Sequence, residues 1–215
     1  MSSSEDSWSH RVSRVVEATS YSQLRDGYDA WAEQYDADHF NYGQLLLAHF
    51  TGMFCRHIPK GIGPILDAGA GTGRVGETLS LHGYNDFVGI DLSAGMLKVA
   101  RAKPGYRDTR VMKLGETLSF ADNSFVAAVS LAAFSPNHCR ADAFDELIRV
   151  TRPGGILVIS MRAGFEPITG FKRRGTDLES QGLWQLIDET GEFVSHPELD
   201  PPMRYSVSVY RKTIV

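Results

Sequence analysis

The chain has 215 residues, of which 42% are hydrophobic and 22% charged, a composition typical of one globular domain with a full core. The 22 Lys and Arg residues against 26 Asp and Glu residues give a net charge of −4, and no run of like charges is long enough to follow a nucleic acid backbone. Cys55 and Cys139 are too few for a disulfide scaffold or a zinc site. We therefore expect buried thiols in a reducing compartment, and neither a metal ion nor a nucleic acid partner.

The N-terminal segment MSSSEDSWSHR is polar and acidic and lacks the apolar core of a signal peptide. The longest apolar runs, such as FVAAVSLAAF, are too short to span a bilayer. These features predict a cytoplasmic protein with no membrane association. Residues 1–18 are expected to form a flexible tail.

Two helices are expected next. Ser20 is a candidate N-cap with Gln23 three residues later, and the helix continues through YDAWAEQYDAD with an aromatic face. A second amphipathic helix is expected over NYGQLLLAHFTGMFCRHI. We expect residues 19–60 to form a helical lid on the same domain, of which residues 61–215 are the core.

From residue 64, short apolar runs alternate with helical patterns. The expected strands are PILDA, DFVGIDL, TRVMKL, SFVAAVSL and GGILVISM, and the expected helices lie over RVGETLSLHG, SAGMLKVARA and ADAFDELIRVTR. This alternation predicts an α/β fold with a doubly wound, mostly parallel, Rossmann-like sheet.

After residue 163 we expect a loop over AGFEPITGFKRRG, a helix over TDLESQGLWQLIDET, and two closing strands near GEFVSH and RYSVSVYRKTIV. Only PELDPPM separates these last strands, so they are expected to pair as a C-terminal antiparallel hairpin. The sheet then has seven strands.

The stretch ILDAGAGTGRVGETL matches the dinucleotide fingerprint G-x-G-x-x-G at Gly71, Gly73 and Gly76. However, Asp67 directly precedes these glycines, and a carboxylate about 4 Å from a pyrophosphate costs about 1 to 4 kcal/mol. A cationic or zwitterionic ligand suits this loop better. Asp91 ends the next expected strand, where a carboxylate accepts hydrogen bonds from ribose hydroxyls. Gly76 is expected to allow close helix-to-sheet packing.

Four motifs in order, LDAGAGTG, GIDLSAGML, GETLSFADNSFVAAV and ELIRVTRPGGILVIS, resemble those of the class I S-adenosylmethionine-dependent methyltransferases. The segment YDAWAEQYDADHFNYG is similar to a helix of the methyltransferase-like proteins of the Williams-Beuren syndrome region and their invertebrate relatives. The resemblance implies S-adenosyl-L-methionine as cofactor and S-adenosyl-L-homocysteine as product.

The resemblance also implies a set of cofactor-binding residues, namely Tyr28, Tyr35, Asp67, Ala68, Gly69, Gly71, Thr72, Asp91, Leu92, Met96, Gly115, Glu116, Leu131 and Ala132. In this set the glycine loop from Asp67 to Thr72 cradles the methionine part, and Asp91 holds the ribose. Leu92 and Met96 flank the adenine. Leu131 and Ala132 lie under the sulfonium.

Gly115 and Glu116 occupy the place where related enzymes contact the adenine amino group. Leu114 stands where an Asp is common in those enzymes, so a contact from the backbone fits the sequence as well as one from a side chain. Purely structural roles could also explain several of these residues. The glycines could serve only a tight turn, Asp91 could cap the helix that starts near Ser93, and Leu92 and Met96 could be ordinary core.

Methyl transfer from a sulfonium is an in-line displacement, so orientation and exclusion of water do most of the work. The best-placed base is His138 in FSPNHCRAD, with a surface or helix-capping histidine as the alternative. The residues expected to meet the acceptor are Trp31, Tyr42, Arg162 and Phe165, together with Phe171. The basic FKRRG run could hold an anionic group or be a solvated loop.

The leading hypothesis is therefore a methyltransferase that acts on an O or N atom of a small molecule. A protein side chain as acceptor, or a cofactor-binding regulatory protein without catalysis, are alternatives. An NAD-linked oxidoreductase is disfavoured by Asp67. The SPNHC loop fits neither motif of the nucleic acid base methyltransferases, and the oligomeric state is not readable from the sequence.

Overall fold

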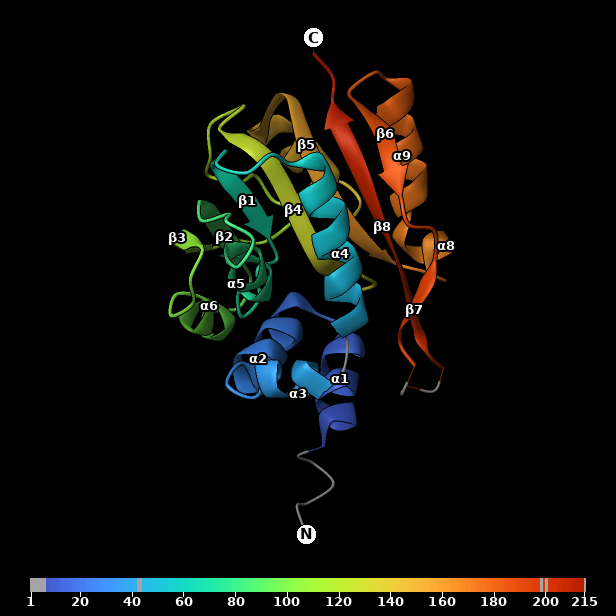
Figure 1. Ribbon diagram of the computed structural model, residues 1–215. Helices are drawn as coiled ribbons and strands as arrows, with labels where there is room; N and C mark the ends of the chain where they lie inside the picture. The colour runs from blue at the N-terminus through green and yellow to red at the C-terminus, as the bar shows by residue number, and fades with distance from the viewer. Residues whose placement is uncertain (1–6, 42–43, 198, 200, 215) are drawn as a thin grey trace.

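The computed structural model describes residues 7–41, 44–197, 199 and 201–214. Its centre is one eight-stranded sheet in the order β3-β2-β1-β4-β5-β8-β6, with β7 paired to β8 off this path (Figure 1). The strands are β1 (Ile65–Ala68), β2 (Phe87–Asp91), β3 (Tyr106–Val111), β4 (Phe125–Phe134), β5 (Thr151–Arg162), β6 (Trp184–Glu189), β7 (Phe193–His196) and β8 (Met203–Lys212). The first five pair in parallel, and β8 runs antiparallel to β5, β6 and β7.

The described helices are α1 (Trp8–Val16), α2 (Tyr21–Trp31), α3 (Tyr35–Asn41), α4 (Gln44–His57), α5 (Arg74–Ser80), α6 (Ala94–Ala100), α7 (Ala143–Val150), α8 (Glu166–Thr169) and α9 (Phe171–Ser180). Helices α1, α2 and α3 gather at one end of the sheet, beside the ends of β1 and β4, and α4 crosses its face (Figure 1). The predicted α/β, mostly parallel fold with an antiparallel C-terminal pair is confirmed.

Both faces of the sheet are covered, as the continuous apolar strands require. In β5, Leu157 and Ile159 pack on the face under α7 and α9, whereas Val158 packs on the opposite face under α4. Phe50 and Phe54 of α4 are fully buried against this second face. Side chains alternate between the two faces of each strand, and α4 turns its apolar stripe toward one of them. The protein therefore has two hydrophobic cores, one on each side of the sheet.

The N-terminal region differs from the predicted tail. Residues 8–16 form α1, which begins at the N-cap Ser7 and buries Val15 against α2 and α6. Residues 1–6 lie outside the described part. The predicted helix from Ser20 is capped as expected, because the Ser20 hydroxyl accepts a hydrogen bond from the Gln23 N–H at 3.2 Å. It ends at Trp31 rather than continuing, and α3 follows after a short turn.

The region after residue 163 also differs. The predicted loop contains α8 and the first half of α9, because the Glu166 carboxylate accepts hydrogen bonds from the N–H groups of Lys172 and Arg173 at the start of α9. The predicted helix over residues 176–190 stops near Gly182, which has a φ of 68°. Beyond it lies β6, so the sheet of the described residues has eight strands and the predicted number of seven is wrong. Trp184 of β6 is buried and stacks on Tyr210 of β8, with 3.9 Å between the ring centroids.

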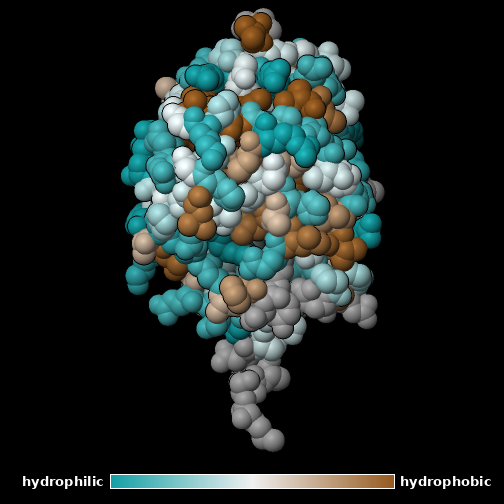
Figure 2. Space-filling view, viewed as in Figure 1, coloured by the Kyte–Doolittle hydropathy of each residue, from teal (hydrophilic) through white to brown (hydrophobic). Residues whose placement is uncertain are grey.

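The predicted C-terminal hairpin is confirmed, because β7 pairs antiparallel with β8 from Phe193 to His196. On the face in view, hydrophobic side chains lie in separate groups among hydrophilic ones (Figure 2). Within the described residues, no helix is both long and apolar enough to cross a membrane.

Candidate active site

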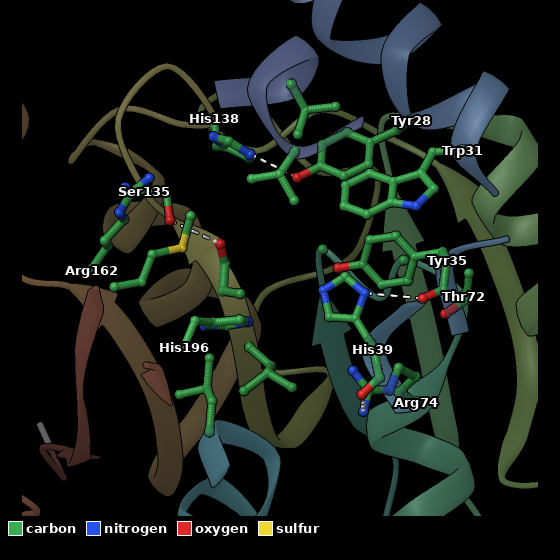
Figure 3. A pocket seen from close by; sticks show the side chains of 18 of the residues that line it. Tyr28, Trp31, Tyr35, His39, Thr72, Arg74, Ser135, His138, Arg162 and His196 are labelled. Atoms are coloured by element: carbon green, nitrogen blue, oxygen red, sulfur yellow. Dashed lines mark hydrogen bonds between the residues drawn. The ribbon is translucent and has the colours of Figure 1, made fainter. Parts of the chain in front are cut away.

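Two adjoining cavities lie between the lid helices α1, α2 and α3 and the ends of β1, β2 and β4. The Asp91 cavity is lined by Asp91, Leu92 and Met96, with Met112, Lys113 and Leu114 after β3. The aromatic cavity is lined by Trp8, Val12, Trp31, His39, Arg74, Ser135, Arg162, His196, Met203 and Tyr205, among others (Figure 3). The two cavities share one wall, formed by Tyr28, Tyr35, Gly69, Gly71, Leu131, Ala132 and His138.

The glycine loop after β1 forms the floor of both cavities. Gly69 and Gly71 have φ values of 81° and 54°, which glycine adopts at little cost. A Cβ atom on Gly69 would lie 2.6 Å from the Ala133 Cβ, whereas one on Gly71 would meet nothing within 4 Å. Gly71 therefore presents its backbone to open cavity space, where a ligand can approach closely.

Asp91 fixes this loop and faces the cavity. Its carboxylate accepts hydrogen bonds from the Gly71 N–H at 2.9 Å and from the Ser93 N–H at 2.8 Å. Burial raises the pKa of Asp91, and these backbone N–H groups oppose the rise. The hydrogen bond from Ser93 agrees with the alternative that Asp91 caps the start of α6. The carboxylate still has lone pairs that can accept a hydrogen bond from a hydroxyl group in the cavity.

Asp67 lies behind the loop and lines neither cavity. It is fully buried, and one carboxylate oxygen accepts a hydrogen bond from the Tyr106 hydroxyl. The other oxygen, Oδ1, has no hydrogen-bond partner among the described residues. Burial raises the pKa of Asp67 to about 7, although the bond from Tyr106 opposes it. Gly76 also packs here: a Cβ atom on it would lie 2.4 Å from the Tyr106 ring, consistent with the expected packing role.

His138 and Tyr28 meet at the shared wall. The His138 Nδ1 lies 2.8 Å from the Pro136 carbonyl oxygen, and its Nε2 lies 2.8 Å from the Tyr28 hydroxyl (Figure 3). Because a carbonyl only accepts, Nδ1 carries the proton, and Nε2 of the neutral ring accepts a hydrogen bond from Tyr28. Burial lowers the pKa of His138 and raises that of Tyr28 well above 10. Both side chains are therefore neutral, and the unprotonated Nε2 of His138 can act as a base toward the Tyr28 hydroxyl.

The end of β4 carries backbone strain at the same wall. Ala132 has a φ of 63°, unusual for a residue with a side chain, and its N–H donates to the Ser160 hydroxyl at 2.7 Å. A left-handed non-glycine residue costs about 1 to 3 kcal/mol and is typical of functional sites.

The lid is tied to the core by carboxylates. Asp29 of α2 accepts hydrogen bonds from the Ser93 hydroxyl at 2.5 Å and the Gly95 N–H at 2.8 Å. Asp36 of α3 accepts a hydrogen bond from Thr72 of the glycine loop at 2.5 Å. These bonds hold the lid over the loop.

Most predicted site residues come together at these cavities. Six do not line either cavity, and a seventh lies outside the described residues. Glu116 is exposed, pairs with Lys113 at 2.7 Å, and lies with Gly115 outside both cavities, so the adenine contact expected from these two residues stays a prediction. The cavity is instead lined by the residue just before this pair, Leu114.

Asp67 and Ala68 lie behind the glycine loop, and the Ala68 carbonyl accepts a hydrogen bond from Ser130. Phe171 is buried in the core against Phe134, so the expected contact with an acceptor is wrong in this structure. Phe165 lies outside the aromatic cavity, against Arg162. Tyr42 lies outside the described residues.

Sequence reasoning missed several residues of the aromatic cavity. They are Trp8 and Val12 of α1, His39, Arg74, Ser135, His196, Met203 and Tyr205. Trp8, Val12 and Val15 recur at helical spacing, so the amphipathic pattern of α1 was a usable signal. His196, Met203 and Tyr205 come from β7 and β8, and only the tertiary fold brings them to the loop.

Residues 66–159 match the family model described as a methyltransferase domain. The chain belongs to the class I S-adenosylmethionine-dependent methyltransferases, which confirms the resemblance in the four motifs. It is 31% identical to human methyltransferase-like protein 27 over 74% of this chain and 66% of that protein. It is 30% identical to demethylmenaquinone methyltransferase of Symbiobacterium thermophilum over 77% of this chain and 68% of that protein.

Among solved structures, a TehB-like methyltransferase from Corynebacterium glutamicum matches 87% of this chain and 99% of that chain, with a TM-score of 0.60 and 23% identity. A putative methyltransferase solved with the Haloferax volcanii Trm112 activator matches 89% of this chain and 98% of that chain, with a TM-score of 0.65 and 16% identity. These structures share the fold. The chain spans about two thirds of methyltransferase-like protein 27 and 40% of the demethylmenaquinone methyltransferase of Renibacterium salmoninarum.

The chain thus belongs to the S-adenosylmethionine-dependent methyltransferase family, and its residues fit that cofactor. The open position at Gly71 admits a ligand against the backbone, and the Asp91 carboxylate can accept from ribose hydroxyls. Leu92 and Met96 offer apolar surface for a base. Arg74 lines the aromatic cavity together with Gly71 and Thr72, and its guanidinium can pair with a carboxylate.

Proposed function

We propose that this enzyme methylates an O or N atom of a small molecule bound in the aromatic cavity. The observation that carries the proposal is the shared wall. Tyr28, His138 and Ala132 line both cavities, so a cofactor held by Asp91 and Gly71 would have its reactive end at residues that also face the second cavity. Donor and acceptor would therefore meet at one wall, as an in-line displacement requires.

When bound, S-adenosylmethionine supplies a sulfonium methyl group: its C–S bond breaks, a C–O or C–N bond forms, sulfur becomes a neutral thioether, and the acceptor releases a proton. Tyr28 and His138 are the groups best placed to take that proton. Tyr28 can receive it at its oxygen while its own proton moves to Nε2 of His138 over the 2.8 Å bond. General base catalysis of this kind contributes about 10² to 10⁴ in rate.

The lid supports a small acceptor. The aromatic cavity is roofed by Trp8, Val12 and Trp31, and α1 is tied to α3 by two bonds from Arg11 to Asp38, at 2.9 and 3.0 Å. Trp31 also donates to Asp38 at 2.7 Å. A roof fixed in this way would limit the access of water to the shared wall, which favours a small acceptor over a polymer.

The names of the relatives span several acceptors. They include demethylmenaquinone, a malonyl-acyl-carrier protein and a tRNA carboxymethyluridine. A protein acceptor, or a cofactor-binding regulatory protein without catalysis, are therefore kept as alternatives. The roofed cavity and the net charge of −4 favour a small molecule over a nucleic acid.

Calorimetry and a methyl-transfer assay test the proposal. The protein is titrated with S-adenosylmethionine, S-adenosylhomocysteine and NAD, and then incubated with methyl-labelled cofactor and a library of small hydroxyl and amine compounds. We expect binding of the first two ligands and label transfer to at least one compound. Cofactor binding with label transfer only to protein, or to no compound, would contradict the small-molecule proposal and favour an alternative.

A further inference from the structure

The charges of the aromatic cavity are unbalanced. Two arginines, Arg74 and Arg162, line it, and no Asp or Glu is among its described lining residues. Within the described part of the chain, neither arginine forms an ion pair. Placing a cation in a part-buried cavity without a counter-charge is costly. The cavity therefore favours anionic ligands.

The two arginines lie on different sides of the cavity (Figure 3). Arg74 begins α5, directly after the glycine loop, and donates to the His39 carbonyl at 3.3 Å. Arg162 ends β5 and lies beside Ser135. On the proposed function, the carboxylate of the cofactor's methionine part accounts for Arg74. Arg162 is left for a second anion.

We propose that the methyl acceptor is a small carboxylic acid, and that Arg162 binds its carboxylate. This rests on the proposed function and names the class of acceptor. The guanidinium lies over the Phe165 ring at 4.8 Å, a contact that orients the planar group without neutralising its charge. An Arg–carboxylate pair can be bidentate, which fixes the bound molecule in orientation as well as in place.

The surroundings of Arg162 fit a monoanion. Tyr205 is its register partner on β8, and the Tyr205 and Ser135 hydroxyls lie 3.3 Å apart. One guanidinium and two hydroxyls suffice for a carboxylate. A phosphate dianion offers more charge than this side of the cavity neutralises. Burial lowers the pKa of His138, and that of His39 to about 4, so these two rings add no positive charge at neutral pH.

The rest of the wall fits an apolar or aromatic body. Trp8, Val12 and Met203 line the cavity with carbon and sulfur, and Tyr28 and Trp31 present stacked rings. A molecule anchored at Arg162 extends along this surface toward the Tyr28–His138 pair. The accepting hydroxyl or amine then lies at the far end of the molecule from its carboxylate.

The test measures binding of matched probes to the protein preloaded with S-adenosylhomocysteine. Each probe is an aryl or alkyl carboxylic acid paired with its uncharged carboxamide, for example 3-(4-hydroxyphenyl)propionate and its amide. A charge-assisted pair predicts that at least one acid binds about 10- to 100-fold more tightly than its amide. In Arg162→Gln this ratio falls to near one, whereas Arg162→Lys keeps part of it.

Two further variants serve as controls. Arg173→Gln removes a positive charge from an exposed position outside the aromatic cavity and should keep the native ratio. Arg74→Gln should weaken S-adenosylhomocysteine binding and keep the preference for acids. If Arg162→Gln does not fold, the native ratio and the Arg162→Lys variant still decide the matter.

The outcomes separate this inference from the proposed function. If no acid binds better than its amide, or if the preference survives in Arg162→Gln, the carboxylate proposal is wrong. It is then wrong whether or not the protein transfers methyl groups to uncharged compounds. If acids bind selectively through Arg162 but no compound is methylated, the anion site stands and the small-molecule methyltransferase proposal fails.

Discussion

Replacing Asp67 with Asn is expected to change how the free energy of unfolding depends on pH. Burial raises the pKa of this fully buried carboxyl from its usual 3.8 to about 7. Between these values the folded protein holds a proton that the unfolded chain has lost. The stability from this proton is complete below pH 3.8 and is lost as the pH rises through about 7. A shift of about three pKa units corresponds to about 4 kcal/mol.

The amide in Asp67→Asn cannot ionise, so this loss should disappear. Its NH₂ group takes the place of an oxygen that has no partner among the described residues, which costs about 1 to 3 kcal/mol at every pH. We therefore expect the variant to be less stable than the native protein at pH 5 by about that amount. At pH 8.5 it should be as stable or more stable.

Urea unfolding at the two pH values measures this difference. Asp177→Asn, at an exposed position on α9, is the control and should keep the native pH dependence. If Asp67→Asn changes the stability equally at pH 5 and pH 8.5, then Asp67 is ionised in the same way in the folded and unfolded states. The reasoning from its burial would then be refuted.

Three further predictions concern the cavities. Asp91→Ala should weaken S-adenosylhomocysteine binding by about 10- to 100-fold in calorimetry, whereas Glu116→Ala, outside both cavities, should leave it unchanged; equal losses would contradict the ribose role. His138→Ala should lower kcat by about 10² to 10⁴ with cofactor affinity retained, and Tyr28→Phe should lower it too. Because the pKa of His138 is lowered, native activity should persist at pH 6.5 and fall only in more acid solution. Val12→Trp should fill part of the aromatic cavity and raise the acceptor's KM more than it weakens S-adenosylhomocysteine binding, since the cofactor's carboxylate is expected at Arg74 in the same cavity; equal losses would mean that donor and acceptor do not occupy separate sides.

The sheet and the glycine loop were predictable because their signals are local. The continuous apolar run of β5 and the placement of Gly69 and Gly71 after a buried strand depend only on neighbouring residues. Asp91 followed from its place at the end of β2. These residues define the cofactor side of the site.

The acceptor side was less predictable because it is assembled from distant segments. His196 and Tyr205 reach the cavity only because β8 inserts between β5 and β6, a pairing that local patterns do not encode. The residues of β6 were expected to be helical. They form a strand whose Trp184 stacks on Tyr210 of β8, and a long-range contact of this kind cannot be read from the local sequence. The contact expected at Glu116 stays a prediction, and Leu114, two residues earlier, is the residue of this motif that lines the Asp91 cavity.

The most direct test of the account is a structure of the protein with S-adenosylhomocysteine bound. We expect the ribose hydroxyls on the Asp91 carboxylate, the adenine against Leu92 and Met96, and the sulfur at the wall shared by Tyr28 and His138, facing the aromatic cavity. A nucleoside bound elsewhere, or a sulfur atom turned away from the aromatic cavity, would contradict the central claim that the two cavities hold the donor and the acceptor.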